Sequence, residues 1–178
     1  MVLLIIHYIS DLFTKMFGTV VLCLSSILIL LPQMSQTTTV YKCGSKNTEV
    51  LNNTTVVTFQ NCTTSRCAIK RNSTMHIEIK FKLEIDVKDL ITEVYGKALN
   101  IPVPLLGIDN KNICNNIYEE DGIKTKCPLL KGKTYIYKED IYIIKAYPKF
   151  KVDVHWSLQD PNSRTVITCF EAPAKIID

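Results

Sequence analysis

The stretch MHIEIKFKLEIDVK, residues 75–88, alternates apolar and polar side chains over its whole length. Successive side chains of a β-strand point to opposite faces of the sheet, so this alternation places every apolar side chain on one face. The stretch therefore predicts a long β-strand with one buried face and one face in contact with water.

The same alternation recurs in FKVDVHWSL, residues 150–158. Weaker strand patterns occupy residues 54–60, 90–99, 134–144 and 165–171, and turn-forming sequences such as DPNS, residues 160–163, lie between strands. No segment after residue 36 shows a convincing helical period. This pattern predicts an all-β fold, an immunoglobulin-like β-sandwich of about seven antiparallel strands in two sheets.

The first 36 residues differ from the rest of the chain. No residue from Met16 to Val40 is charged, and the mostly apolar run of residues 17–31 follows Lys15. This run is shorter than the ~20 residues that a membrane-spanning helix needs. We therefore predict that residues 1–36 are a cleaved signal peptide and that residues 37–178 form the mature domain. An uncleaved anchor is the alternative, and Met16 is a second candidate for the first residue.

Six cysteines follow this leader, an even number as disulfide pairing requires: Cys43, Cys62, Cys67, Cys114, Cys127 and Cys169. An exported chain meets an oxidising compartment, and no CxxC motif is present, so disulfides are predicted and a metal site is not. Six cysteines allow 15 pairings. Spacing favours Cys62 with Cys67 and Cys114 with Cys127, which leaves Cys43 for Cys169.

Four Asn-x-Ser/Thr sequons, at Asn52, Asn53, Asn61 and Asn72, lie in the first third of the mature chain. Such sequons accept N-linked glycans in secreted proteins. Their clustering predicts an exposed face that carries sugars, although the adjacent Asn52 and Asn53 are not expected to be used together.

Neither an enzyme nor a nucleic-acid-binding protein is predicted. The two histidines outside the leader, His76 and His155, have no nucleophile at motif spacing, and no glycine-rich phosphate loop or cofactor motif occurs. Both histidines occupy polar positions of predicted strands, so we expect them to face solvent. Export and the lack of interleaved exposed aromatic residues argue against nucleic acid as a partner.

Several short motifs follow one another in the second half of the chain: NIPVPL (residues 100–105), CPL (127–129), GKTYIY (132–137), AYP (146–148) and VHWSLQD (154–160). In this order, and with the six cysteines, they resemble the Niemann-Pick C type 2 family of secreted carriers, which have the MD-2-related lipid-recognition fold. The resemblance covers the chain from residue 41 to the end. Leu105 and Asn100 stand where vertebrate sterol carriers generally have an aromatic residue and glycine, which is reminiscent of the arthropod branch.

The resemblance implies the same three disulfides and a sandwich whose sheets separate at one end around a tunnel for a sterol, fatty acid or similar apolar lipid. It places six residues along the tunnel: Met75, Ile77, Ile79, Val152, Val154 and Trp156. It places six more at the mouth: Val103, Leu105, Ile141, Ile143, Tyr147 and Pro148. A sandwich with a filled core that serves adhesion, and a lipid-presenting immune protein of the same fold, remain alternatives because both need the same alternation.

A carrier of this kind is expected to be a monomer in the extracellular fluid or the lysosomal lumen, and to pass its lipid to membranes or to a membrane lipid transporter. Lysines concentrate in the later half of the chain, at positions 124, 126, 131, 133, 138, 145, 149 and 151, and the net charge is +4. They predict a basic face near the mouth that docks on anionic membranes, with an ordinary solvated face as the alternative.

Overall fold

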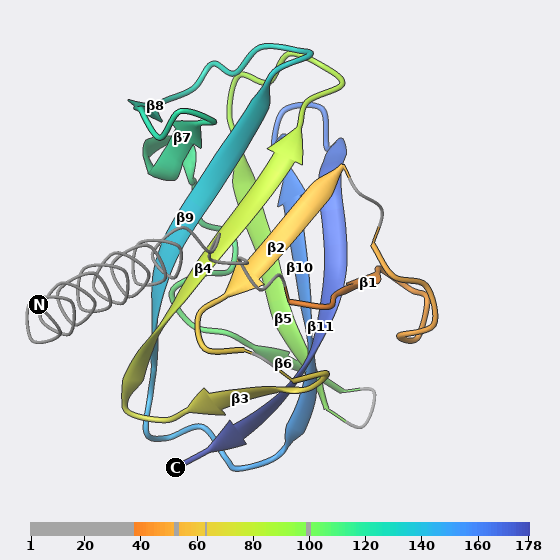
Figure 1. Cartoon of the computed structure of the whole chain (residues 1–178), viewed down its shortest axis with the longest axis vertical. Helices are drawn as coiled ribbons and strands as arrows, with labels where there is room; N and C mark the ends of the chain where they lie inside the picture. Colours follow the sequence, from red (N-terminus) through yellow and green to blue (C-terminus); the bar gives the residue numbers. More distant parts are fainter. Residues whose placement is uncertain (1–37, 52–53, 63, 99–100) are drawn as a thin grey trace, which may run out of the picture. The chain divides into compact units, whose positions relative to one another are not determined.

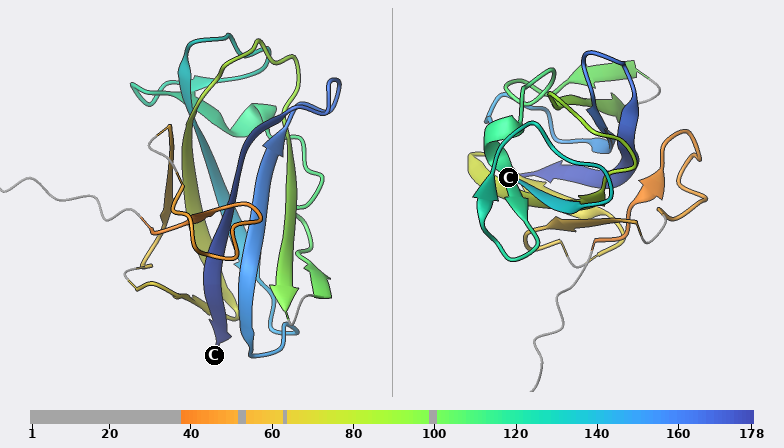
Figure 2. Two further views of the ribbon diagram at one scale, coloured as in Figure 1. Left: turned by 90° about the vertical axis from the view of Figure 1, so that its right-hand side faces the viewer. Right: turned by 90° about the horizontal axis from the view of Figure 1, so that it is seen from above.

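Two β-sheets packed face to face make up the described part of the chain (Figures 1 and 2). The computed structural model describes residues 38–51, 54–62, 64–98 and 101–178. The predicted signal peptide and the sequons at Asn52 and Asn53 lie outside these residues, and both stay predictions.

One sheet contains five strands in the order β2-β4-β9-β7-β8. Their bounds are Thr55–Phe59 (β2), Ser73–Lys82 (β4), Thr134–Ile143 (β9), Ile117–Glu119 (β7) and Lys124–Thr125 (β8). The second sheet contains six strands in the order β1-β11-β10-β5-β6, with β3 beside β11. Their bounds are Tyr41–Lys42 (β1), Cys67–Lys70 (β3), Ile91–Ala98 (β5), Ile101–Pro104 (β6), Lys151–Gln159 (β10) and Val166–Ile177 (β11).

This arrangement confirms the predicted all-β sandwich. The six longest strands, β2, β4, β5, β9, β10 and β11, fall on the six segments with strand patterns. The other five strands have only two to four residues each, too few for alternation to reveal them. Strand β3 pairs in parallel with β11, whereas the other described pairs are antiparallel. Within the described residues, no helix is long and apolar enough to cross a membrane.

Strand β4 ends at Lys82, six residues before the alternating stretch does. Beyond it, the Leu83 backbone bonds to Lys133 and Gly132, and Val87 exchanges two backbone hydrogen bonds with Leu129. Leu83 and Val87 stay fully buried through these contacts, but Ile85 is 37% exposed. The prediction of one continuous strand was therefore wrong in its last six residues, because a loop replaces the neighbouring strand there.

Strand β11 is longer than the predicted segment 165–171 and continues to Ile177. It passes through Pro173, which cannot donate a backbone hydrogen bond and usually marks a strand edge. Strand β1 pairs with residues 170–171 and β3 with residues 174–177, so Pro173 lies between these two partners on that side of β11. The gap explains how proline is accommodated inside a strand.

The cysteines pair as Cys43–Cys169, Cys62–Cys67 and Cys114–Cys127, with sequence separations of 126, 5 and 13 residues. These are the pairs that spacing favoured and that the resemblance implied. The first disulfide fastens the segment after β1 to β11, so it connects two parts of the chain that are far apart in sequence.

Candidate functional site

A narrow apolar cavity of about 40 Å³ lies between the two sheets, at the end of the sandwich where β9 ends and β10 begins. Its wall is formed by side chains from both sheets and from the loops beside them. They are Phe59, Cys67, Ile69, Met75, Leu105, Leu106, Ile108, Ile141, Tyr142, Ile143, Tyr147, Val152, Val154, Trp156, Ala172, Ala174 and Ile176. Such a wall offers a ligand dispersion contacts and release of water, with few hydrogen bonds.

Eight of the twelve residues expected to contact a lipid belong to this wall: Met75, Leu105, Ile141, Ile143, Tyr147, Val152, Val154 and Trp156. The other four do not: Ile77, Ile79, Val103 and Pro148. Ile77 and Ile79 face inward but lie in the closed part of the core, with exposures of 1% and 0%. Next to them, the rings of Tyr137 and Phe170 both pack against Trp156, so large side chains occupy the interior beyond the cavity.

Strand β11 contributes wall residues that the sequence patterns missed, namely Ala172, Ala174 and Ile176. The segment around Pro173 carries too little apolar character to suggest a strand with a buried face. A signal was nevertheless present, because Phe170, Ala172, Ala174 and Ile176 alternate with Glu171, Pro173 and Lys175. Small alanine side chains opposite β4 and β9 leave room between the sheets that larger residues would fill.

The cavity is much smaller than a sterol or a fatty acid, since sites for ligands of that size have volumes of ~300–1,000 Å³. A lipid can enter only if side chains and strand ends at the mouth move apart. Met75 and Leu105 are only partly buried, and the methionine side chain is among the most adaptable in protein cores. The wall can therefore rearrange at this end while the aromatic part of the core stays packed.

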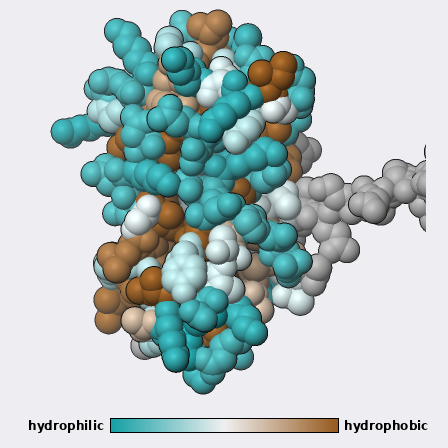
Figure 3. Space-filling model, turned by 90° about the vertical axis from the view of Figure 1, so that its left-hand side faces the viewer, coloured by the Kyte–Doolittle hydropathy of each residue, from teal (hydrophilic) through white to brown (hydrophobic). Residues whose placement is uncertain are grey.

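A hydrogen bond crosses the mouth of the cavity. The backbone N–H of Leu106 donates to the Tyr147 hydroxyl at 3.0 Å, which joins the loop after β6 to the turn between β9 and β10. Leu106 and Tyr142 are 68% and 56% exposed beside this contact. Figure 3 shows apolar side chains reaching the surface in the lower part of a face that is otherwise mostly hydrophilic.

The turn that holds Tyr147 is itself anchored by charges. Arg71 donates to the backbone carbonyls of Lys145 and Tyr147, and Asp178 pairs with both Arg71 and Lys149. The hydrogen bonds from Lys149 and Arg71 lower the pKa of the Asp178 carboxyl to about 2. The carboxylate therefore stays charged across the physiological pH range, and the turn keeps this anchor in neutral and acidic compartments alike.

The lysines of the later half do not form one face near the mouth, so that prediction was wrong in part. Lys145, Lys149 and Lys151 lie in or next to the turn between β9 and β10. Lysines 124, 126, 131 and 133 lie on β8 or in the loop before β9, at the other end of the ten-residue strand β9. Only the first group is near the cavity.

One carboxylate points inward next to the apolar wall. Glu139 occupies an inward-facing position of β9, between the inward-facing residues Tyr137 and Ile141. Its carboxylate accepts hydrogen bonds from Lys111 at 2.8 Å, Asn116 at 3.0 Å and the Tyr137 hydroxyl at 3.1 Å. Burial and the neighbouring Glu139 charge raise the pKa of Tyr137, which keeps its proton for this bond. The carboxylate is thus satisfied within the protein.

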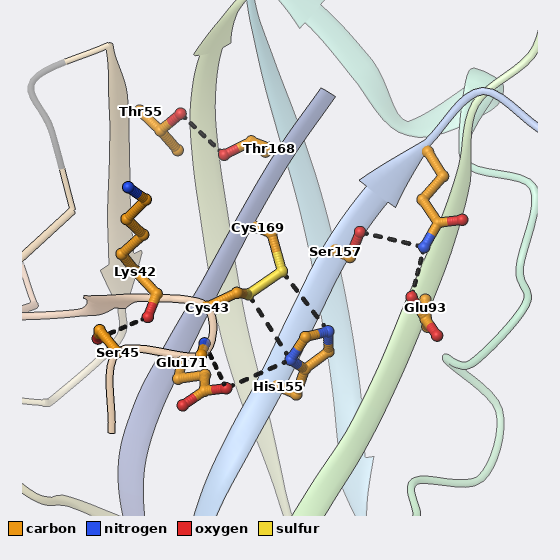
Figure 4. The surroundings of a disulfide bond; sticks show 12 residues. Lys42, Cys43, Ser45, Thr55, Glu93, His155, Ser157, Thr168, Cys169 and Glu171 are labelled. Carbon is orange, nitrogen blue, oxygen red and sulfur yellow. Dashed lines mark hydrogen bonds and ion pairs between the residues drawn. A yellow bond between two sulfur atoms is a disulfide. The ribbon is translucent and has the colours of Figure 1, made fainter. Parts of the chain in front are cut away.

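A second buried cluster surrounds His155 on the outer side of the β10–β11 pair (Figure 4). Its ring stacks on Tyr95 with centroids 4.4 Å apart, and the Cys43 and Cys169 sulfurs lie 3.6 and 3.5 Å from its two nitrogens. The Glu171 carboxylate lies 3.6 Å from Nδ1. The sulfurs are bonded to each other, so the imidazole contacts a disulfide and not two thiolates.

The expectation that His155 faces solvent was wrong, because the residue is only 9% exposed. Alternation places it on the polar face of β10, but the segment that bears Cys43 is fastened over that face by the disulfide. His76, in contrast, is exposed, as expected, and it pairs with Asp140. Burial lowers the pKa of His155, and the nearby Lys97 ammonium lowers it further, while Glu171 opposes both effects.

This environment predicts that the protein loses stability between pH 7.5 and pH 5.5. The unfolded chain takes up a proton at His155 below about pH 6.5, whereas the folded chain resists it. The contribution of neutral His155 to the free energy of unfolding is therefore fully present above pH 6.5. It is lost as the pH falls toward the lower pKa that His155 has in the folded protein. Glu171 has a lowered pKa, so its own contribution is lost only below about pH 4.5, outside this range.

Urea unfolding at pH 7.5, 6.5 and 5.5, with the disulfides intact, measures this effect. In His155→Gln we expect a smaller drop in the free energy of unfolding than in the unaltered protein. His76→Gln makes the same substitution at an exposed imidazole and serves as the matched control. An undiminished drop in His155→Gln would show that other groups cause it.

Comparison with known proteins shows which family the chain resembles. A profile of the ML domain matches residues 37–176. The "NPC intracellular cholesterol transporter 2 homolog a" of Drosophila melanogaster is 36% identical over 136 residues, which cover 75% of this chain and 84% of that protein. The "Ecdysteroid-regulated 16 kDa protein" of Manduca sexta is 34% identical over 110 residues, which cover 62% and 70%.

A solved structure supports the same relationship. The crystal structure of a Niemann-Pick type C2 protein from the Japanese carpenter ant matches with a TM-score of 0.57 and 29% sequence identity, over 68% of this chain and 89% of that chain. The ML-domain match spans all the described strands apart from the last residue of β11. The chain therefore belongs to the ML-domain family, as an arthropod-type member of the Niemann-Pick type C2 group.

Proposed function

We propose that this protein is a secreted carrier that binds a sterol, fatty acid or similar apolar lipid between its two sheets and passes it to membranes or partner proteins. The observation that carries the proposal is the apolar cavity at the end of the sandwich where β9 ends and β10 begins, with a mouth bordered by exposed Leu106 and Tyr142. The name of the Drosophila relative, a cholesterol transporter, supports the lipid class.

The wall is suited to holding a lipid without strong chemical selection. Burying ~500 Å² of apolar surface contributes ~12 kcal/mol at ~25 cal/mol per Å². Association costs ~4 kcal/mol or more, and the difference corresponds to micromolar binding. Because this energy depends on area, related lipids of similar shape should bind with similar affinity.

The proposal is tested by native mass spectrometry of the secreted protein, followed by organic extraction and uptake of a fluorescent sterol and a fluorescent fatty acid. We expect a bound lipid mass that disappears on extraction, and saturable uptake by the delipidated protein. Circular dichroism serves to confirm that the extracted protein is still folded. A folded, delipidated protein that takes up neither probe would contradict the carrier function.

The hydrogen bond across the mouth should control the rate of exchange. Tyr147→Phe removes the acceptor for the Leu106 N–H, a bond of ~0.5–1.5 kcal/mol, so lipid uptake and release should both accelerate by roughly two- to tenfold. The equilibrium affinity should change less than the rates. Stopped-flow transfer of a fluorescent lipid between protein and vesicles measures both rates.

Tyr142→Phe is the matched control for this prediction. Its hydroxyl donates to Asn72 at 2.6 Å, a contact between neighbouring parts of the same sheet that does not cross the mouth. We expect its rates to equal those of the unaltered protein. Unchanged rates in Tyr147→Phe would show that the hydrogen bond to Leu106 does not limit exchange.

We propose that Lys145, Lys149 and Lys151, in or beside the turn whose Tyr147 bonds to the exposed Leu106, bring the mouth to anionic membranes. Positive charges near a membrane surface are each attracted by anionic lipids with ~1 kcal/mol. Co-sedimentation should therefore be stronger with anionic than with neutral vesicles, and equal binding would contradict the docking role.

Secretion is proposed together with N-glycosylation. Asn61 and Asn72 are both exposed and occupy left-handed turn positions, with φ of 60° and 55°. Amidase treatment of the secreted protein should lower its mass, and an unchanged mass would contradict glycosylation.

A further inference from the structure

Trp156 is the only tryptophan in the sequence, and it borders the cavity. It lies on β10 with 1% of its surface exposed, beside the rings of Phe170 and Tyr137, whose centroids are 6.4 and 6.3 Å away. Its indole Nε1 is buried and has no hydrogen-bond partner in the part of the chain that the structure describes. Buried tryptophan N–H groups usually have such a partner.

The other polar side chains of the cavity wall are already engaged. The Tyr147 hydroxyl accepts from Leu106, the Tyr142 hydroxyl donates to Asn72, and Cys67 is bonded to Cys62. Two more buried side-chain atoms lack partners among the described residues, Asn47 Oδ1 and Arg71 Nε, but neither residue belongs to the wall. The Tyr147 hydroxyl can still donate its own proton, but it lies in the turn at the mouth. Among the wall residues, the indole N–H is the one buried side-chain donor that lacks a partner within the described part of the chain.

The position of Trp156 along β10 shows how far this donor lies from the mouth of the cavity. Val152, Val154 and Trp156 follow one another inward from the turn at the mouth. At ~3.3 Å per residue, Trp156 lies about 13 Å deeper than Val152. A lipid that entered through the mouth would bring its leading end toward the indole.

We infer, building on the proposed carrier function, that the Trp156 N–H donates a hydrogen bond to a neutral oxygen at the leading end of the lipid. The protein then selects lipids with a hydroxyl or carbonyl at that end over those that end in plain hydrocarbon. A neutral oxygen fits this role because burial of an ionised group in such an apolar wall is far more costly. We expect a preference of roughly tenfold, since the hydrogen bond replaces an unpaired buried donor.

Two matched ligand pairs test this inference: cholesterol with 25-hydroxycholesterol, and octadecanoic acid with its 17-oxo derivative. Within each pair the members differ only in an oxygen near the tail end. Because the chain has one tryptophan, ¹⁵N-labelled protein gives a single indole N–H signal. That signal should move downfield with the oxygen-bearing members and stay near its original position with the plain ones.

Replacing Trp156 with 3-benzothienyl-L-alanine keeps the ring shape and substitutes sulfur for the N–H group. Since Trp156 is the only tryptophan, a tryptophan auxotroph introduces this analogue at a single position. The ratio of affinities within each ligand pair should fall from roughly tenfold to about one, a comparison that does not depend on the absolute affinity of the altered protein. Trp156→Phe offers a second route to the same comparison if the analogue lowers the protein yield.

The outcomes separate the inference from the proposed function. Equal affinities within each pair, with no indole shift, would overturn the donor role while lipid uptake upheld the carrier. An equal indole shift with all four ligands would overturn the selection of a tail oxygen. Failure of every ligand to bind folded protein would remove the carrier function itself.

Discussion

Removing the Cys43–Cys169 disulfide, in the double variant Cys43→Ala with Cys169→Ala, should lower the free energy of unfolding by ~4–5 kcal/mol. The bond closes a loop of 126 residues, and chain-entropy estimates for loops of this length are of that size. The variant also loosens the segment that covers His155, which exposes the imidazole to water. Urea unfolding at pH 7.5 measures the change.

The Cys62→Ala, Cys67→Ala double variant is the control for this prediction. It removes a bond between residues only 5 positions apart, so the same estimate gives a loss of ~2 kcal/mol. Both variants replace two cysteines with alanine. The difference between their losses of unfolding free energy therefore reports the effect of loop length and of the segment that covers His155. An equal or smaller loss for the Cys43–Cys169 pair would contradict the prediction.

Ala174→Leu should weaken lipid binding and lower the apparent affinity at least tenfold. Ala174 is 1% exposed and lies on the cavity wall, so a leucine side chain there would project into the space that the lipid needs. Placing a larger side chain in the core in this way typically lowers the free energy of unfolding by ~1–3 kcal/mol. A protein with three disulfides can tolerate this loss. Titration with a fluorescent lipid measures the affinity, and near-ultraviolet circular dichroism confirms the fold.

Lys175→Leu is the matched control, because it places the same side chain on the next residue of β11, which is exposed. Its uptake should equal that of the unaltered protein. Ala172→Leu, at another wall position of β11, repeats the test if Ala174→Leu does not fold. Normal uptake by a folded wall variant would show that the lipid binds outside this cavity.

The long strands and two of the disulfide pairs could be predicted because they depend on local signals, alternation and cysteine spacing, and the third pair followed by elimination. The surroundings of His155 could not. Its position in β10 is polar by alternation, and it is buried only because a segment more than 100 residues away in sequence is fastened over it. Alternation indicates which face of a strand a side chain occupies but not what covers that face.

The limits of the cavity could not be predicted for a related reason. Ile77 and Trp156 both face inward, yet only Trp156 borders the cavity. Whether an inward side chain meets a partner or a space depends on the volumes opposite it, which different strands supply. The small residues of β11 create the space, and a segment of alanine and proline gives little indication of a binding wall.

The packed aromatic rings and the adaptable mouth divide the sandwich into two parts with different tolerance to change. In the filled part Trp156 contacts Tyr137 and Phe170, and Phe81 contacts Tyr135, so substitutions there are costly. Exposed mouth residues such as Leu106 contribute little to that packing. Natural variation, or a protein engineer, can thus alter the mouth to suit a different cargo without first having to restore the stability of the scaffold.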